Sequence, residues 1–355
     1  MLTRRRRSLP DQVVDSVNKE DIPLPRVEFI STGSIPLNLA ASQKGRHGGW
    51  ARGRIINIVG DGSTGKTLLA LETAAHAFHH IKSIKSVLFP EVKRIQIVYN
   101  NVEGVMDFPI EEMYGQDFVA GVEWIQSETC QHFGRDYQRR VQGLPAGCFL
   151  LYIADSIDAM ISQEAKDRIE KSIKQDKEED GSYGTEKAKY FSQSFFNNLC
   201  SIMKGKDATL ILISQVRENL NSGTFGKKFY RTGGKALDFF THQVVWLYKM
   251  GALKREFKGH EVTYGVKIKC KFERNKVAKP FREMDLPIIF DYGVDDIRAM
   301  LNYLGTTAIK EIEAKINEAE TNPDYYDSLI NEMEGEWSII ENHVTTKRRK
   351  KYATD

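Results

Sequence analysis

Residues 60–67 combine glycines, hydroxyl side chains and one lysine at a spacing suited to holding phosphate groups. In order they are Gly60, Asp61, Gly62, Ser63, Thr64, Gly65, Lys66 and Thr67, a full match to the P-loop pattern. Glycines let the backbone curl so that successive N–H groups point at phosphate oxygens. Lys66 can reach the β- and γ-phosphates, and the Thr67 hydroxyl can hold Mg²⁺. This loop therefore predicts that the chain binds a nucleoside triphosphate with Mg²⁺.

The residues on either side of this loop predict the elements that position it. Before it, residues 55–59 form a short apolar run rich in isoleucine, which suits a strand buried in a parallel sheet. After it, residues 68–78 carry leucine, alanine and phenylalanine at helical spacing. A glycine-rich turn that merely precedes a helix is the alternative. The strand before and the helix after favour the phosphate loop, whose helix presents its N-terminus to the anion.

A second strand ends in a carboxylate. Residues 148–154 (CFLLYIA) are strongly apolar, and Asp155 follows them directly. Such a strand carries the carboxylate to the edge of the sheet where the P-loop lies, so that Asp155 can support Mg²⁺ through water, as in a Walker B element. A simple turn cap is the alternative. Together with the P-loop, the pattern favours a magnesium site formed by Thr67 and Asp155.

Composition excludes several classes of protein. The 355 residues carry a formal net charge of +3, and no apolar run approaches the roughly 20 residues of a membrane-spanning helix. The basic cluster Arg4–Arg7 is not followed by an apolar segment, so no secretory signal is expected. The cysteines are scattered and are expected to be reduced thiols in a cytoplasmic protein. A second basic cluster, Lys347–Lys351, is either a polyanion contact or a solvated tail.

The order of predicted elements indicates an α/β fold with a mostly parallel central sheet flanked by helices. Apolar strands at 94–100, 148–154 and 209–214 alternate with helical segments, whereas 264–272 and 284–290 are expected to form an antiparallel pair. Residues 29–53 contain many Gly and Ser residues and are expected to be irregular. We predict an N-terminal arm (1–28), a nucleotide-binding core (29–304) and a small helical C-terminal appendage with a basic tail (305–355).

The ordered set of motifs resembles the RecA family of DNA recombinases, bacterial and phage. The matching segments are Ile30–Ser34, the P-loop with its strand, Gln215–Arg217, Gly233–Leu237 and Arg274–Phe281 (RNKVAKPF), in the family's order between about residues 29 and 304. The resemblance implies a RecA-like P-loop ATPase core that binds ATP and Mg²⁺. The C-terminal appendage is more similar to the tails of phage recombinases, so a phage origin is one expectation.

The resemblance also implies catalytic roles. Glu103 would orient the attacking water, and Gln215 would sense the γ-phosphate and pass its state to the following loop. Arg274 and Lys276 would reach the ATP of a neighbouring subunit in the manner of arginine fingers. The alternatives are a surface glutamate and a solvated hairpin turn. Lys66 completes this predicted catalytic set. Ile110 stands where the family has an aromatic residue that stacks on adenine, and Tyr114 is a candidate substitute.

Two loops would bind DNA. The first lies at about 176–186, is rich in acidic residues, and is followed by Lys187 and Lys189. The second spans 217–231, where basic and aromatic residues alternate, as suits single-stranded DNA. Its predicted contacts are Arg217, Leu220, Phe225, Lys227, Lys228, Phe229, Tyr230 and Arg231, followed by Gly233, Gly234 and Lys235.

The predicted function is that of an ATP-dependent recombinase in DNA recombination and repair. It would form a helical homo-oligomer on single-stranded DNA, pair this with double-stranded DNA, and act in the cytoplasm of a bacterium or of a phage-infected host, away from membranes. One alternative is a ring-forming motor, such as a helicase. Another is a recombination mediator that binds ATP and DNA with little turnover.

Overall fold

The structure is a computed structural model of the chain, and it describes residues 27–104, 106, 108–175, 183–218, 229–231 and 234–345. Its strands are β1 Phe29–Ile30, β2 Trp50–Ala51, β3 Ile55–Gly60, β4 Arg94–Asn101, β5 Val122–Ile125, β6 Cys148–Asp155, β7 Ala208–Glu218, β8 Phe229–Arg231, β9 Gln243–Phe257, β10 His260–Asn275, β11 Glu283–Ile289 and β12 Gly293–Val294. Its α-helices are α1 Ile35–Ser42, α2 Lys66–His80, α3 Ile110–Tyr114, α4 Gln116–Gly121, α5 Cys130–Gln142, α6 Gln163–Gln175, α7 Tyr183–Lys189, α8 Phe196–Ile202, α9 Gly234–Phe240, α10 Asp296–Tyr303, α11 Ile309–Thr321 and α12 Pro323–Val344. The 3-10 helix η1 (Ile81–Ser83) and the π-helix η2 (Tyr190–Phe195) complete the set described.

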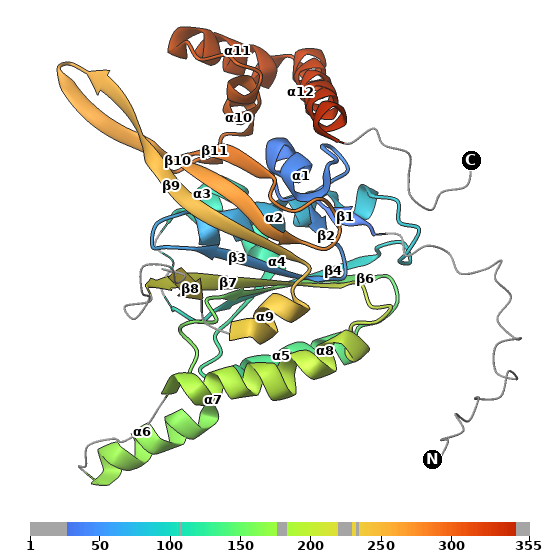
Figure 1. Ribbon diagram of the computed structural model, residues 1–355, viewed down its shortest axis with the longest axis vertical. Coiled ribbons are helices and arrows are strands. Elements are labelled where there is room, and N and C mark those ends of the chain that lie inside the picture. Colours follow the sequence, from blue (N-terminus) through green and yellow to red (C-terminus); the bar gives the residue numbers. More distant parts are fainter. Residues whose placement is uncertain are drawn as a thin grey trace, which may run out of the picture.

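One large sheet forms the centre of the molecule (Figure 1), in the order β12-β11-β10-β9-β3-β7-β6-β4-β5, and β8 pairs with β7. The strands from β5 across to β9 run parallel to their neighbours. Every residue of β3 and of β6 is buried, as continuous apolar strands covered on both faces should be. The predicted α/β fold with a mostly parallel sheet is therefore confirmed.

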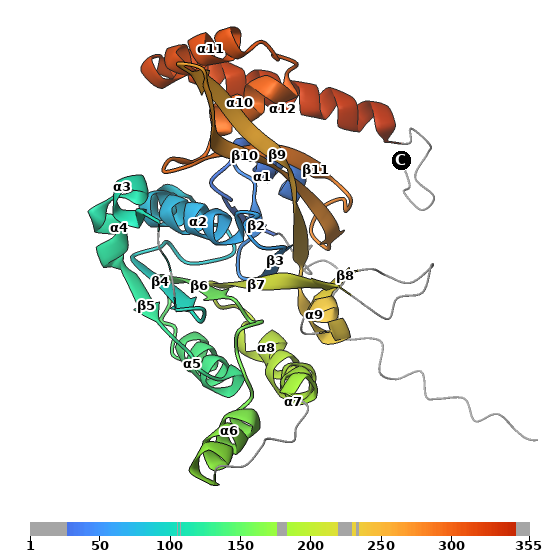
Figure 2. The ribbon, with the colours of Figure 1, turned by 90° about the vertical axis from the view of Figure 1, so that its left-hand side faces the viewer.

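Helices cover both faces of this sheet (Figures 1 and 2). α2, α3 and α4 lie on one face, whereas α5 and α8 lie on the other. Each layer has its own apolar core: one includes Leu69 and Ala70 of α2, and the other is built around aromatic residues such as Phe133 and Phe195. The two cores clamp the parallel strands, so the loops at the strand ends rest on a rigid support.

An antiparallel extension continues the sheet beyond β9. β10 pairs with β11, with Gly265 opposite Ile289 and Lys271 opposite Glu283, so the antiparallel pair predicted from the sequence is confirmed. The β9–β10 hairpin projects past the body of the sheet (Figure 1), and its Arg255 forms a salt bridge with Glu313 of α11. The C-terminal helices pack together through Trp337 of α12, whose ring lies 6.0 Å from that of Tyr303.

One expectation about local structure is wrong. Residues 29–53, expected to be irregular, contain the buried helix α1, whose N-cap Ser34 accepts a hydrogen bond from the Leu37 backbone N–H. Pro36 lies in the first turn, where its missing N–H costs nothing. The division into arm, core and appendage remains a prediction. Most of the arm and the Lys347–Lys351 cluster lie outside the described residues.

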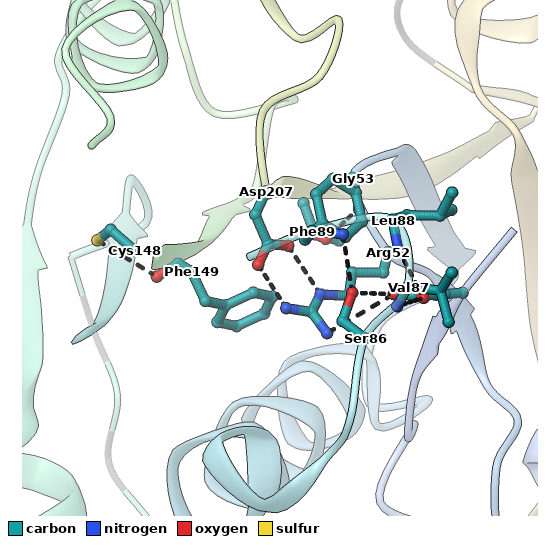
Figure 3. A network of polar contacts seen from close by, with 11 residues as sticks. Arg52, Gly53, Ser86, Val87, Leu88, Phe89, Cys148, Phe149 and Asp207 are labelled. Atoms are coloured by element: carbon teal, nitrogen blue, oxygen red, sulfur yellow. Dashed lines mark hydrogen bonds and ion pairs between the residues drawn. The ribbon is translucent and has the colours of Figure 1, made fainter. Parts of the chain in front are cut away.

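A buried ion pair fastens the amino ends of the central strands (Figure 3). Arg52 precedes β3 and Asp207 precedes β7, and the guanidinium Nε donates to Asp207 Oδ1 at 2.8 Å. The rings of Phe89 and Phe149 lie 5.1 and 5.5 Å from the guanidinium carbon. Glu28 accepts from the backbone N–H of Val87 and Leu88, as well as from the Ser86 hydroxyl, so the chain entering β1 is tied to this cluster.

Candidate active site

The P-loop connects the carboxyl end of β3 to the first residue of α2. Gly65 has φ 80°, in the left-handed region that favours glycine. A Cβ there would lie 2.5 Å from Ile288 Cδ1, and a Cβ on Gly60 would lie 2.4 Å from Thr64 Oγ1. Beside Gly62, by contrast, nothing lies within 4 Å of an added Cβ. The loop is thus fixed at its two ends and open at its middle, which fits a cradle for phosphates.

Lys66 reaches back across this loop. Its ammonium donates to the Asp61 carbonyl oxygen at 2.7 Å. Burial lowers the pKa of Lys66, and the charges of Asp155, Glu103 and other nearby carboxylates oppose that shift. The lysine therefore lies inside the mouth of the loop among acidic groups. The ammonium is therefore already placed where it can contact the phosphates of a bound triphosphate.

The magnesium ligands expected from the sequence are in contact. The Thr67 hydroxyl donates to Asp155 Oδ2 at 2.6 Å, and the Tyr99 hydroxyl of β4 donates to the same oxygen at 2.7 Å. Asp155 is buried, which raises the pKa of its carboxyl, and the two hydroxyl donors counteract the shift. A hydroxyl and a carboxylate at this point are the oxygen ligands that Mg²⁺ prefers, so the residues fit the ion. Sequence reasoning missed Tyr99.

Glu103 and Gln215 also meet at this edge. Gly60 lies opposite Gln215 in the β3–β7 register, which places Gln215 directly beside the P-loop. Gln215 Nε2 donates to Glu103 Oε1 at 2.8 Å, and the Ser156 hydroxyl donates to the same oxygen at 2.7 Å. The structure thus brings together five residues that the sequence singled out: Lys66, Thr67, Asp155, Glu103 and Gln215.

Arg274 and Lys276 lie toward the amino ends of the parallel strands, whereas the P-loop follows the carboxyl end of β3. Arg274 is paired with Val244 near the start of β9, and Val244 is the partner of Asn57 in β3. Gly60 lies three residues further along β3, about 10 Å away at the usual rise of a strand. Lys276 donates to the Phe239 carbonyl oxygen, and burial together with Arg274 lowers the pKa of its ammonium. Within one chain these cations do not face the P-loop.

Comparison with known proteins agrees with this geometry. The family model described as the RecA N-terminal domain matches residues 13–104 and 144–295, more than half of the chain. The chain belongs to the RecA family. It is 26% identical to Protein RecA of Wolinella succinogenes over 286 residues, which cover 79% of this chain and 70% of that protein. Protein RecA of Thermus thermophilus is 28% identical over 290 residues, 79% of this chain and 73% of its own.

The predicted second DNA loop is described only at its two ends. β7 and β8 pair antiparallel there, with Arg217 opposite Tyr230, and Phe229 and Arg231 lie in the same β8 strand. Gly234 and Lys235 begin α9. The other predicted contacts, Leu220, Phe225, Lys227, Lys228 and Gly233, lie outside the described residues. The loop is therefore anchored on the strand that carries Gln215.

The first DNA loop requires a correction. Lys189 is exposed on α7, as a phosphate contact should be, but Lys187 is 6% exposed. Its ammonium donates to the backbone carbonyl oxygen of Asp158 at 2.8 Å, with Ile157 O at 3.4 Å. A lysine turned inward in this way does not reach a DNA backbone. The expectation that Lys187 contacts DNA is therefore not supported by its position in this RecA-family chain.

A cavity of about 490 Å³ lies beside the carboxyl end of β4. Ile110, Phe108, Met106 and Trp124 contribute to its wall, whereas Tyr114 is not among its lining residues. The Tyr114 ring packs edge-on against Phe118, with 5.8 Å between ring centroids. Recognition of adenine in this RecA-family member stays a prediction. In the described part of the chain, no helix is both long and apolar enough to cross a membrane.

Proposed function

We propose that this chain is an ATP-dependent DNA recombinase that assembles on single-stranded DNA and catalyses homologous pairing and strand exchange. The observation that carries the proposal is the meeting of Lys66, Thr67, Asp155, Glu103 and Gln215 at one edge of the sheet. This set contains a phosphate cradle, a metal site, a base for water and an amide sensor. The relatives named Protein RecA support the assignment.

Hydrolysis needs four tasks, and the chain offers a residue for each. Lys66 and the loop amides bind and orient the β- and γ-phosphates of ATP. Thr67 and Asp155 would hold Mg²⁺, which when bound neutralises charge on those phosphates. Glu103 positions the attacking water and accepts its proton. Beside these tasks, Gln215 would act as a sensor, because it lies between the phosphate loop and the second DNA loop and its contacts change with the nucleotide.

The fourth task, stabilising charge on the transferred phosphate, falls to Arg274 and Lys276 of a neighbouring subunit. Their place toward the amino ends of the parallel strands supports action on another chain's ATP. A contact between two different surfaces of identical subunits generates an open helical filament unless the rotation closes it into a ring. We therefore propose a homo-oligomeric filament with ATP at each interface, acting on DNA in the cytoplasm.

The test is ATP turnover with and without single-stranded DNA, on samples also imaged by electron microscopy. The proposal expects strong stimulation by DNA and helical filaments that depend on DNA, followed by strand exchange in a second assay. The Lys66→Ala variant is the control and should lose turnover while keeping its circular dichroism spectrum. Turnover with closed rings would indicate a motor instead, and binding without turnover would indicate a mediator.

A further inference from the structure

The turn that follows β6 holds Glu103 and Gln215 from one side. The Ser156 hydroxyl donates to Glu103 Oε1 at 2.7 Å, and the Asp158 carboxylate accepts from the Gln215 backbone N–H at 2.8 Å. The turn is itself pinned to the sheet, because the Ile157 N–H donates to the Ile213 carbonyl oxygen. Any displacement of residues 156–158 would therefore move both the proposed base and the proposed sensor.

Lys187 holds the same turn from the other side. Its ammonium donates to the carbonyl oxygen of Asp158 at 2.8 Å and lies 3.4 Å from that of Ile157. Burying an ammonium costs free energy unless the group is hydrogen-bonded. The two carbonyl groups therefore stabilise Lys187 in this buried position. The side chain of Lys187 thus links α7 to the turn that supports Glu103 and Gln215.

α7 is also the helix that borders the first DNA loop. It begins at Tyr183, and its Lys189 is exposed two residues beyond Lys187. On its other side, Glu186 accepts from Arg168 of α6 at 2.6 Å and from the Ser162 hydroxyl at 2.8 Å. Polar contacts, which can exchange partners, thus join α7 to α6 and to the turn, whereas its carboxyl end continues into η2, where Phe191 and Phe195 are buried in the apolar core.

We propose that Lys187 is a positioning residue that couples DNA bound at α7, where Lys189 is exposed, to ATP hydrolysis. When α7 shifts on binding DNA, Lys187 moves the turn at residues 156–158 and so changes the hydrogen bonds on Glu103. Glu103 Oε1 accepts from both Ser156 and Gln215, and an oxygen that holds two donors is a poor acceptor for a water proton. The inference rests on the proposed function and gives DNA at α7 a route to the base separate from the second loop, which follows Gln215.

The experiment compares Lys187→Met with Lys189→Met, two charge removals on one helix. For each, the DNA affinity is measured by fluorescence anisotropy with a non-hydrolysable ATP analogue and Mg²⁺, and kcat is measured without DNA and at saturating DNA. Lys187→Met should keep the DNA affinity, whereas its ratio of DNA-saturated to DNA-free kcat should fall by roughly 5-fold or more, the usual scale of coupling between sites. Lys189→Met should weaken DNA binding and keep that ratio at saturation.

A second pair of variants tests the other half of the link. Asp158→Ala removes the acceptor of the Gln215 N–H, whereas Asp158→Asn removes the charge and keeps an acceptor oxygen. The ratio of DNA-saturated to DNA-free kcat should fall in Asp158→Ala, whereas Asp158→Asn should keep most of the wild-type ratio. The Lys187→Met/Asp158→Ala double variant should lose no more than the larger single loss, because both changes break one link. Asp158→Ala also keeps the test available if Lys187→Met fails to fold.

The failures are distinguishable. A wild-type chain whose turnover does not respond to DNA would overturn both the coupling and the proposed function. If DNA stimulates ATP turnover equally in the wild-type chain, in Lys187→Met and in Asp158→Ala, the coupling alone is overturned. Reduced DNA affinity in Lys187→Met with an unchanged ratio would also overturn it, and would return Lys187 to the DNA contacts.

Discussion

The Thr67 hydroxyl donates a 2.6 Å hydrogen bond to Asp155 Oδ2, which joins the first turn of α2 to the carboxyl end of β6. Tyr99 donates to the same oxygen from β4, so three elements meet on one carboxylate. If Asp155 supports Mg²⁺ through water, Tyr99 orients the carboxylate without touching the ion. Residues that orient a metal's partners affect metal affinity nearly as much as the partners themselves.

We expect the Tyr99→Phe variant to need more Mg²⁺. Removing one hydroxyl leaves Asp155 free to turn, and the Mg²⁺ concentration for half-maximal ATP turnover should rise by roughly 10-fold. Titration of turnover with Mg²⁺ at saturating ATP measures this. Tyr137→Phe is the matched control, since the Tyr137 hydroxyl is buried with no hydrogen-bond partner in the described structure. Equal Mg²⁺ curves for Tyr99→Phe and wild type would contradict the role given to Tyr99.

The position of Arg274, away from the P-loop of its own chain, predicts complementation between defective chains. Lys66→Ala lacks the phosphate-binding lysine, and Arg274→Ala should lose roughly 10³-fold in kcat, as removal of an arginine finger does. Mixing the two should restore part of the turnover, because a Lys66→Ala chain still offers Arg274 to the intact P-loop of its neighbour. The measurement is ATP turnover on single-stranded DNA as a function of mixing ratio.

A mixture of Lys66→Ala with Glu103→Ala is the control for that experiment. Both residues serve the same P-loop edge, so every interface in this mixture is damaged and no turnover should return. Recovery in the control, or its absence when Arg274→Ala is mixed with Lys66→Ala, would show that Arg274 does not act on a neighbour.

Glu72 gives the fold a dependence on pH. This α2 side chain is half-buried between Gly33 and Gly293, and its Oε1 accepts from the Val294 N–H at 3.0 Å. Burial, together with the charge of Asp296, raises the pKa of Glu72 from 4.5 to about 7. Between these pH values the unfolded chain loses the proton and the folded chain keeps it. The stabilisation is therefore complete below about pH 4.5 and is lost as pH rises through about 7.

The Glu72→Gln variant should remove this dependence. At pH 8 it should exceed wild type in free energy of unfolding by up to about 3 kcal/mol, and the difference should shrink toward pH 5. Urea unfolding at four pH values between 5 and 8 provides the comparison. Glu320→Gln, a change at an exposed carboxyl on α11, should follow wild type throughout. A Glu72→Gln curve parallel to wild type would show that Glu72 is ionised in the folded chain at all these pH values.

The buried pair at the other end of the sheet predicts a large loss of stability. Asp207→Ala would leave the fully buried guanidinium of Arg52 with no carboxylate nearer than that of Glu28, at 4.0 Å, which should cost about 3–5 kcal/mol of unfolding free energy. Glu261→Ala breaks the exposed pair with Lys254, whose side chain is 51% exposed, and should cost at most about 1 kcal/mol. Chemical denaturation of both variants and of wild type at pH 7 measures the two losses. Equal small losses would mean that water reaches Arg52.

The sequence predicted what is local and apolar. The P-loop is a run of consecutive residues, and the buried strands β3 and β6 show as continuous apolar segments, so both could be located directly. Glu103 and Gln215 came from the resemblance, since a polar residue at a strand end has many uses. Tyr99 was detectable in principle, because a tyrosine within a buried strand needs a partner for its hydroxyl.

Other features depend on contacts that no single segment contains. Lys187 lies in a charged stretch and was expected to face DNA, whereas the carbonyl groups that hold it come from residues 157 and 158. The first residues of β10, before Tyr264, were missed because the β9–β10 hairpin extends beyond the body of the sheet, where both faces carry exposed residues and no alternation remains. α1 was missed because the Gly and Ser content of residues 29–53 suggested irregular structure, although the glycines of this segment lie outside the helix.

The separation of the P-loop from Arg274 and Lys276 gives any open filament two unlike ends. At one terminus a P-loop has no neighbour to supply cations, and at the other a pair of cations has no P-loop to serve. Under the proposed assembly, ATP bound at the first terminus would be hydrolysed most slowly, so the subunit there would keep its nucleotide longest. The filament would therefore have a built-in polarity of growth and loss, set by the separation of these two groups along the strands of one sheet.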